Sequence, residues 1–330
     1  MTRYDLLTFG ENMIRLSTRN YERLEQAQML DFKHGGAEAN VAVGLARMEH
    51  TSAWVSRLAD NPLGRKIERD LNAWGVDTSH IVWTNDGRIG TFFLEVGAPP
   101  RPSAVLYDRR DSTMSQMTVA DFPWDVLAAA RWLHLTGITT AISESCRALV
   151  AEAMQRARSA GLTVSYDVNY RARLWTPVQA RAVIAPLCRE TDVLFITQAD
   201  AARVFDIRGV SESPSGARDE EMVRALAAQF ARKIVVMTLN ARGAMALDKA
   251  NGEVYRAAAY PVTFTVDRVG AGDAFAAGFI AGYMEEGIAS GLTMGNALAA
   301  LKMTMHGDYA LVTRAEVDAL IAGGAGGISR

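Results

Sequence analysis

Short apolar runs alternate with longer amphipathic segments along most of this chain. Five of the apolar runs are bounded by glycine, polar or charged residues and are predicted as buried strands: YDLLTFG at 4–10, RWLHLTGI at 131–138, LTVSYDVN at 162–169, DVLFITQ at 192–198 and KIVVMTL at 233–239. Helices with a Ser or Thr cap are predicted at 143–161 and 176–190. This alternation predicts an α/β fold with a mostly parallel sheet and helices on both faces.

Two segments, near 13–33 and 87–110, break this rhythm. They contain strand-like pieces, such as RIGTFFLEVG at 88–97 and SAVLYDRR at 103–110, with no crossover helix between them. That pattern is typical of antiparallel strands. Two interpretations are open: an edge extension of the main sheet, or a small lid over the sheet's carboxyl edge, where open α/β folds bind ligands.

The composition narrows the classes of partner. Of 330 residues, 49% are hydrophobic and 22% are charged, and the formal net charge of -2 provides no broad attraction to nucleic acid or to an anionic membrane. We find no apolar segment that predicts a signal peptide or a membrane span. The two cysteines, Cys146 and Cys188, fit no metal-binding spacing. We therefore expect a cytoplasmic protein whose partners are small molecules.

The stretch VGAGD, at 269–273, is the first candidate for chemistry. Gly270 and Gly272 allow close approach of the main chain to a ligand, and the loop then opens a helix. The N–H groups of Ala271, Gly272 and Asp273 would face a phosphate there, with the Asp273 carboxylate beside it as proton acceptor. This is a layout for phosphoryl transfer. Taken alone, the five residues fit an ordinary helix cap equally well.

A second stretch, HGGAEANVAVGLARM at 34–48, places paired glycines before another predicted helix. Gly35 and Gly36 would permit close approach of a hydroxyl-rich ligand, and Asn40 can both donate and accept hydrogen bonds. Helix capping is again the simpler alternative.

Taken together, the two stretches resemble the paired signatures of the ribokinase-like (PfkB) carbohydrate kinase family. The pattern GG-x-x-x-N-x-A-x-x-L-A-R occurs near the N-terminus and D-x-x-G-A-G-D-x-F-x-x-G near the C-terminus. The resemblance implies one ribokinase-like kinase domain over 1–330, a three-layer sandwich with a small β-strand lid. Within the family, GAEANVA and DVNYRARLW are most similar to the 2-keto-3-deoxygluconate kinases.

The resemblance also implies roles for individual residues. Asp273 would be the catalytic base, with Gly270, Ala271 and Gly272 as the anion hole. ATP, accompanied by Mg²⁺ that bridges its phosphates largely through water, would bind a further set of residues: Asn169, Thr197, Thr238, Asn240 and Gly243. Asn240 stands where the family usually has glycine, although Asn tolerates left-handed backbone angles. Asp200, in a weakened form of the family's magnesium-linked N-x-x-E element, is the candidate closest to the metal.

The substrate side of the prediction depends on arginine. A sugar acid carries a carboxylate, which favours the planar fork of a guanidinium group. Arg109 and Arg171 are the candidates, and Tyr107 would add a hydroxyl. The resemblance assigns the same role to these residues and adds Gly35, Gly36, Asn40 and Asp308 as sugar contacts. The simpler alternative is that an arginine on a lid is a solvated surface charge and does not bind the substrate.

Three rival functions remain. A dinucleotide-dependent oxidoreductase would need G-x-G-x-x-G after the first strand, where this chain has TFGENMIRL. A non-catalytic sugar-binding regulator could have the same fold. A kinase of a neutral sugar such as fructose or ribose would leave Arg109 and Arg171 without a role. By the resemblance, we also expect a homo-oligomer.

Overall fold

A nine-stranded sheet forms the centre of the computed structural model, which describes residues 3–209 and 215–324. The strand order is β15-β14-β13-β12-β11-β10-β1-β4-β6. In chain order these strands span Tyr4–Phe9 (β1), Ser52–Val55 (β4), Val76–Asp77 (β6), Ala130–Thr136 (β10), Thr163–Asp167 (β11), Val193–Thr197 (β12), Ile234–Thr238 (β13), Ala244–Asp248 (β14) and Val254–Ala257 (β15). Only the pairs β13–β14 and β14–β15 are antiparallel. The predicted mostly parallel sheet is therefore confirmed.

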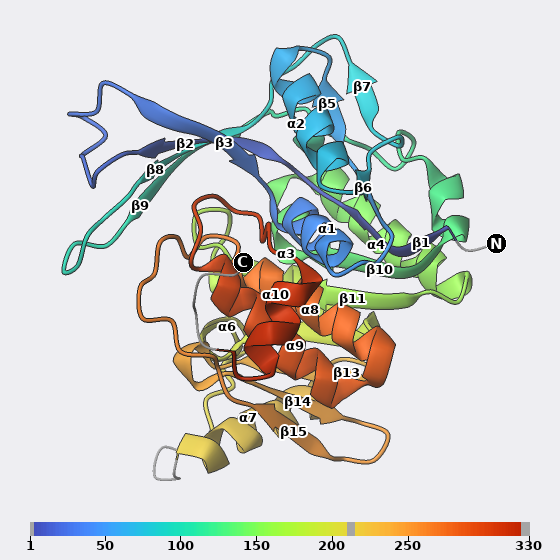
Figure 1. The fold of residues 1–330 in the computed structure, drawn as a ribbon. Coiled ribbons are helices and arrows are strands. Elements are labelled where there is room, and N and C mark those ends of the chain that lie inside the picture. The colour runs from blue at the N-terminus through green and yellow to red at the C-terminus, as the bar shows by residue number, and fades with distance from the viewer. Residues whose placement is uncertain (1–2, 210–214, 325–330) are drawn as a thin grey trace.

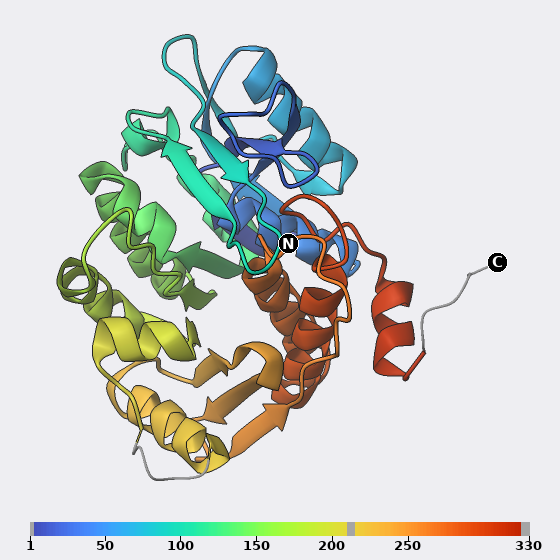
Figure 2. The same cartoon turned by 90° about the vertical axis from the view of Figure 1, so that its left-hand side faces the viewer.

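Helices cover both faces of this sheet (Figure 2). One helical layer contains Ala37–Arg47 (α1), Ala271–Glu286 (α8), Ile288–Lys302 (α9) and Arg314–Ile321 (α10). The other contains Gly137–Ile142 (α3), Glu144–Ser159 (α4), Pro177–Glu190 (α5), Gln198–Phe205 (α6) and Ser215–Gln229 (α7). Helix α2, Pro62–Ala73, packs beside α1 with a strand pair formed by Arg57–Ala59 (β5) and Val82–Thr84 (β7). The result is the three-layer sandwich of the expected fold class.

The helix starts follow the predicted caps. The side chain of Ser143 accepts a hydrogen bond from the N–H of Cys146 at the start of α4. At the start of α5, Thr176 and Gln179 form a capping box in which each side chain accepts a hydrogen bond from the other residue's N–H. Local side-chain chemistry thus sets where these helices begin.

A second, four-stranded sheet extends away from the main body (Figure 1). Its order is β3-β2-β8-β9, with bounds Met13–Thr18 (β2), Leu30–Gly35 (β3), Thr91–Glu95 (β8) and Ala104–Asp108 (β9). It is separate from the main sheet, so the edge-extension interpretation is wrong. The antiparallel prediction is correct for β2–β3 and β8–β9, but β2 and β8 pair in parallel because they come from two distant segments. We call these four strands the lid sheet.

Polar residues follow the carboxyl ends of neighbouring parallel strands in the main sheet. In the β10–β11 register Thr136 lies opposite Asp167, and in the β12–β13 register Thr197 lies opposite Thr238. These ends therefore form one polar edge, at which an open α/β sheet binds its ligands. No helix of the described residues has both the length and the apolar character needed to cross a bilayer.

Candidate active site

The predicted catalytic loop leads directly into α8. Gly270, the residue before this helix, has a φ of 84°. A Cβ at this position would lie 1.9 Å from the carbonyl oxygen of Asp308, so both the backbone angle and the close approach require glycine. The structure therefore brings Asp308 to the anion-hole loop from 38 residues further along the chain.

The N–H groups at the start of α8 differ in their partners. The N–H of Ala271 donates to the carbonyl oxygen of Arg268 at 3.2 Å. Gly272 and Asp273 lie in the first turn, where a helix provides no acceptor of its own for the N–H groups. A Cβ on Gly272 would meet no atom within 4 Å, so open space adjoins this turn. Gly272 and Asp273 are thus the N–H donors best placed for an anion.

The carboxylate of Asp273 is buried at the contact between α1 and α8. The side-chain amide of Asn40 donates to its Oδ2 at 2.6 Å. Burial raises the pKa of Asp273 to about 6, although hydrogen bonding from Asn40 and the charge of Arg171 act in the opposite direction. At neutral pH the carboxylate is therefore mostly ionised but has a stronger affinity for a proton than an exposed aspartate has.

Asp308 lies against the glycines of both signatures. Its carboxylate is so close to Gly35 that a Cβ there would be 2.4 Å from Oδ2. Arg15, from the lid strand β2, donates to Asp308 Oδ1 at 2.5 Å and also pairs with Asp267. All three charged side chains are no more than 6% exposed. This buried ion group, which we call the Arg15 group, connects the lid sheet to the two adjoining loops that contain Asp267 and Asp308.

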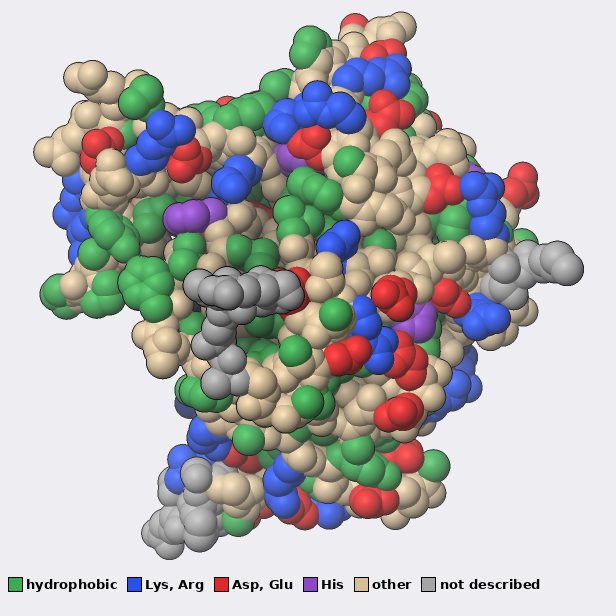
Figure 3. Space-filling model, in the orientation of Figure 1, with side chains coloured by type: hydrophobic (Ala, Val, Ile, Leu, Met, Phe, Trp, Pro, Cys, Tyr) green, Lys and Arg blue, Asp and Glu red, His purple; other side chains and the backbone are tan. Residues whose placement is uncertain are grey.

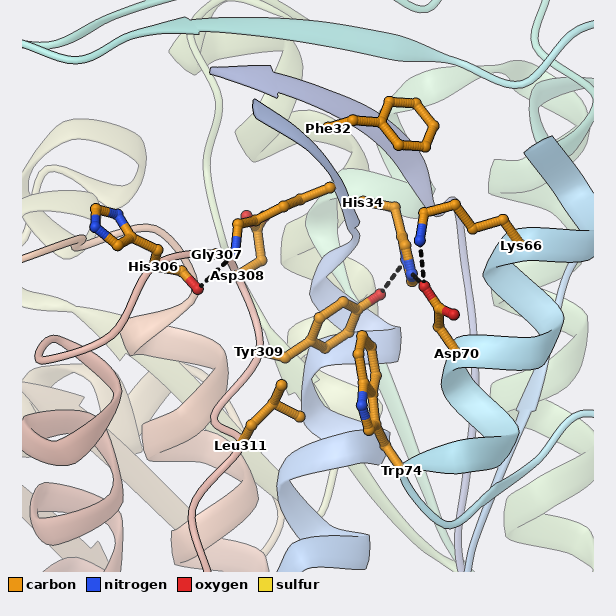
Figure 4. A pocket seen from close by; sticks show the side chains of 11 residues that line it. Phe32, His34, Lys66, Asp70, Trp74, His306, Gly307, Asp308, Tyr309 and Leu311 are labelled. Atoms are coloured by element: carbon orange, nitrogen blue, oxygen red, sulfur yellow. Dashed lines mark hydrogen bonds and ion pairs between the residues drawn. The ribbon is translucent and has the colours of Figure 1, made fainter. Parts of the chain in front are cut away.

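A small cavity of about 170 Å³ has Asp308, His34 and Tyr309 among its lining residues. Figure 4 shows Tyr309 and His34 pointing toward each other at its inner wall. The Tyr309 hydroxyl lies 2.9 Å from His34 Nδ1, and His34 Nε2 lies 3.3 Å from the Asp70 carboxylate of α2. Asn12 donates to the same hydroxyl at 2.7 Å. These contacts hold His34 and Tyr309, the residues next to Gly35 and Asp308, in place, and the polar groups of the inner wall are paired with one another.

The lid sheet places Arg109 at the edge of the site, just after β9. Its guanidinium forms a close ion pair with Glu11, whose side chain is 3% exposed. Among the described residues, Glu11 Oε1 and Arg109 Nε have no hydrogen-bond partner. Arg109 is thus paired with Glu11 and largely shielded from solvent, whereas a lone lid arginine would be solvated, and one acceptor and one donor of this ion pair remain open.

Tyr107 contributes to an apolar cluster on one face of the lid sheet. Phe92 lies opposite it in the β8–β9 register, and Met13 and Leu94 complete the buried part of the cluster. Val269, from the loop before Gly270, packs against these residues. This face of the lid sheet therefore contacts the catalytic loop.

The DVNYR segment lies at the carboxyl end of β11, close to Asp273. The N–H of Asn169 donates to Asp167 Oδ1 at 3.0 Å. Burial and, after it, the carboxylates of Asp273 and Asp200 raise the pKa of Asp167 to about 8, while the charge of Arg171 acts in the opposite direction. The same arginine lowers the pKa of Asp200, which burial raises. The predicted Asn169, Arg171 and Asp200 thus lie around one group of acids, of which Asp200 and Asp273 are buried and Asp167 is half-buried.

The remaining predicted nucleotide residues lie further along the same edge. Thr197 caps α6 by accepting the N–H of Asp200 at 2.9 Å. Thr238 is the last residue of β13. Asn240, which stands where the family usually has glycine, has a φ of 54° and therefore adopts the left-handed conformation that asparagine tolerates. Gly243 donates to the Asn240 carbonyl at 3.0 Å and closes the short Asn240–Arg242 turn.

Magnesium was expected to accompany ATP near Asp200. Within residues 3–209 and 215–324, no three His, Cys, Asp or Glu side chains are grouped as a metal site. Asp167, which is half-buried, and Asp200, which is buried, nevertheless provide two carboxyl groups near each other, and the charge of Asp200 raises the pKa of Asp167, so a nearby cation would be favourable. Carboxylate oxygens are ligands that Mg²⁺ prefers when it retains most of its water.

Four further residues at this site were not predicted from the sequence: Glu11, Arg15, Glu38 and Asp167. Glu38 is buried and accepts hydrogen bonds from Thr136 and Thr139 at the end of β10 and in α3, so it fixes the start of α1. Burial raises its pKa to about 7. For Arg15 and Glu38 the sequence did contain a signal, namely a charged residue within an apolar segment, in MIRLST and GGAEAN respectively. Such a residue is rarely buried without a partner.

Comparison with known proteins agrees with this geometry. A model of the family described as pfkB family carbohydrate kinase matches residues 4–314. The chain is 39% identical over 327 residues to a 2-dehydro-3-deoxygalactonokinase of Haloferax volcanii, with 99% of each protein covered. It is 32% identical over 308 residues to a 2-dehydro-3-deoxygluconokinase of Bacillus subtilis, with 92% of this chain and 91% of that protein covered.

A solved structure shows the same architecture. The crystal structure of a 2-dehydro-3-deoxygluconokinase from Thermotoga maritima matches with a TM-score of 0.88 and 34% identity, covering 96% of this chain and 99% of that one. The oxidoreductase and the non-catalytic regulator are thereby set aside in favour of an ATP-dependent carbohydrate kinase. Since the family model spans nearly the whole chain and both signatures meet at Asp273, this protein belongs to the pfkB family of carbohydrate kinases.

Proposed function

We propose that this kinase transfers the γ-phosphate of ATP to a hydroxyl of a 2-keto-3-deoxy sugar acid, most specifically 2-keto-3-deoxygluconate or its galacto epimer. The observation that carries the proposal is the Asp273 carboxylate, which Asn40 orients beside the open first turn of α8. The names of the relatives, which act on 2-dehydro-3-deoxy sugar acids, support the substrate class. We place the reaction in the cytoplasm, where ATP is available and the free thiols of Cys146 and Cys188 are stable.

In this mechanism Asp273 is the general base. A carboxylate oxygen accepts the proton of the sugar hydroxyl as the hydroxyl oxygen bonds to the γ-phosphorus. The bond from that phosphorus to the bridging oxygen breaks, which leaves ADP and the sugar phosphate. The N–H groups of Gly272 and Asp273, together with the positive end of α8, stabilise the charge on the transferring group. Asn40 keeps the accepting carboxylate in place.

Magnesium would be bound on the ATP side of the site. Asp167 and Asp200 are the residues that would hold it, and when bound it offsets the negative charge of the phosphates. Asn169, Thr197, Thr238, Asn240 and Gly243 line the nucleotide side of the same sheet edge. Arg171, between these acids and Asp273, would contact both ATP and the sugar acid.

The sugar side combines Gly35, Gly36, Tyr107, Arg109 and Asp308. Because the charge of Arg109 is already neutralised by Glu11, the guanidinium group attracts anions in general only weakly. A substrate carboxylate would use its remaining N–H donors, whereas a neutral sugar gives them only hydroxyl acceptors. This difference favours the sugar acid over fructose or ribose.

Replacement of Asp273 by Asn should remove proton acceptance while preserving side-chain size. We expect kcat to fall by about 10²-fold or more with ATP affinity nearly unchanged. In the wild type, kcat/KM should fall as the pH drops through about 6, because protonation of Asp273 removes the base. Steady-state kinetics across pH, with ATP binding by calorimetry, measures both. Normal turnover by Asp273→Asn would show that another group is the base.

Arg109→Ala should reduce the selectivity for a sugar acid. The loss leaves Glu11 and the substrate carboxylate without their cation, at a cost of about 2 to 5 kcal/mol in the transition state. The measured quantity is kcat/KM for 2-keto-3-deoxygluconate divided by kcat/KM for fructose. Arg88→Ala, which removes an exposed lid ion pair with Asp108, is the matched control and should leave the ratio unchanged. A wild type that prefers fructose would favour the neutral-sugar kinase instead.

We further propose that the lid sheet closes over the bound sugar, because its inner cluster already touches Val269. Saturating 2-keto-3-deoxygluconate should slow amide hydrogen exchange in β8 and β9. Strands β14 and β15, at the far edge of the main sheet, serve as the internal control and should not change. Equal exchange rates in β8 and β9 with and without sugar would argue against closure.

The opposite face of the lid sheet supports a homo-oligomer. Leu16, Phe32, Phe93 and Leu106 form a row across its four strands, and Phe32 and Leu106 are 44% and 60% exposed. Figure 3 shows hydrophobic side chains over the lid at the left of the molecule. We propose that this row contacts a second copy of the chain.

Leu106→Glu should therefore shift the protein toward the monomer, because a charge in an apolar contact is unfavourable. Light scattering coupled to size-exclusion chromatography measures the mass. Leu63→Glu, at an exposed leucine on α2, is the control and should not change the mass. A wild-type monomer, or an oligomer insensitive to Leu106→Glu, would contradict this interface.

A further inference from the structure

Lys302, the last residue of α9, is fully buried. Its ammonium group donates to the main-chain carbonyl oxygen of Asp267 at 3.0 Å and lies 3.5 Å from that of Met305. A buried ammonium is unfavourable unless it is paired with acceptors or opposite charges. The catalytic steps described above do not use this group, so its presence needs another explanation.

The charges around Lys302 favour its protonated form. Burial lowers its pKa, and the charge of Arg15 acts in the same direction. The carboxylates of Asp267, Asp308 and Asp273 act in the opposite direction. The site thus combines main-chain carbonyl oxygens with nearby carboxylates, an environment suited to a single positive charge.

The ammonium joins the two loops that form the back of the anion hole. The main chain of the 302–308 loop pairs with the 266–269 loop: the N–H of Asp267 donates to Met303 O at 3.2 Å, and that of Gly307 donates to Asp267 Oδ2 at 3.1 Å. Asp267 Oδ1 accepts the N–H of Val269 at 3.0 Å. Gly270 follows directly and packs on the carbonyl of Asp308. Lys302 therefore bridges both loops within three residues of Gly270.

We propose that the Lys302 ammonium serves as a tethered monovalent cation that positions the Gly270–Gly272 anion hole. An ammonium bound by main-chain carbonyl oxygens has the charge and the type of ligand that a bound potassium or ammonium ion would have. The kinase then needs no added monovalent cation. Removal of the side chain leaves a carbonyl-lined space that such an ion can enter. Lys302 is a positioning residue, and the inference rests on the proposed sugar-acid kinase activity.

The test compares the wild type with Lys302→Ala and Lys302→Met, using 2-keto-3-deoxygluconate and MgATP. Tetramethylammonium chloride keeps the ionic strength constant while potassium, ammonium or lithium chloride is added. Without a small cation, both variants should lose about tenfold or more in kcat, with a smaller change in the KM for sugar. Potassium or ammonium should restore Lys302→Ala, whereas lithium should not. Lys302→Met fills the space with an apolar chain and should not be restored.

Lys249 offers a matched control. Its ammonium also caps two main-chain carbonyls, those of Phe230 and Ala231, but far from the anion hole in the sheet order. Lys249→Ala should keep the wild-type kcat and show no response to the added cation. If Lys302→Ala is unfolded without small cations, potassium or ammonium should restore its thermal transition.

Three results would overturn the inference: a wild type that requires potassium, a Lys302→Ala variant with normal kcat in tetramethylammonium chloride, or no recovery of either kcat or thermal transition with any cation. Failure of the proposed sugar-acid kinase activity can be distinguished from failure of the Lys302 inference. In that case the wild type does not phosphorylate the sugar acid, but potassium still raises the melting temperature of Lys302→Ala more than that of the wild type.

Discussion

The Arg15 guanidinium, buried between Asp267 and Asp308, is the interaction on which the site depends. Because a buried charge is strongly unfavourable without its partners, three segments that are far apart in the sequence must meet at one point. One is a lid strand, one leads into the catalytic loop, and one packs on Gly270. The lid, the anion hole and the sugar side of the site are thus parts of one charged assembly.

Much of the fold was predictable because the relevant signals are local. Apolar runs identified the parallel strands, and Ser and Thr caps identified the starts of α4 and α5. The two glycine signatures identified where α1 and α8 begin. The family resemblance placed Asn40 and Asp273 in one site, and they form a hydrogen bond although α1 follows the lid strand β3 and α8 follows the loop after β15. Asn240 likewise adopts the left-handed angle that its residue type permits.

The rest depends on contacts that no spacing reveals. Glu11 pairs with Arg109 across 98 residues, and Lys302 bonds a carbonyl oxygen 35 residues away. The parallel pairing of β2 with β8 is equally non-local, since alternation shows which side chains share a face but not which strand is the neighbour. A charged residue in an apolar segment indicates that a partner exists, but only the assembled structure identifies it.

The short connections of the lid sheet have a mechanical consequence. Strand β1 ends at Phe9 and β2 begins at Met13, while β3 ends at Gly35 and α1 begins at Ala37. Such connections are too short to act as a flexible hinge. A tilt of the lid would therefore also move the first turn of α1, which contains Asn40. In the closure proposed above, a movement of the lid would therefore also reach Asn40 through the backbone, and with Asn40 the orientation of the proposed base.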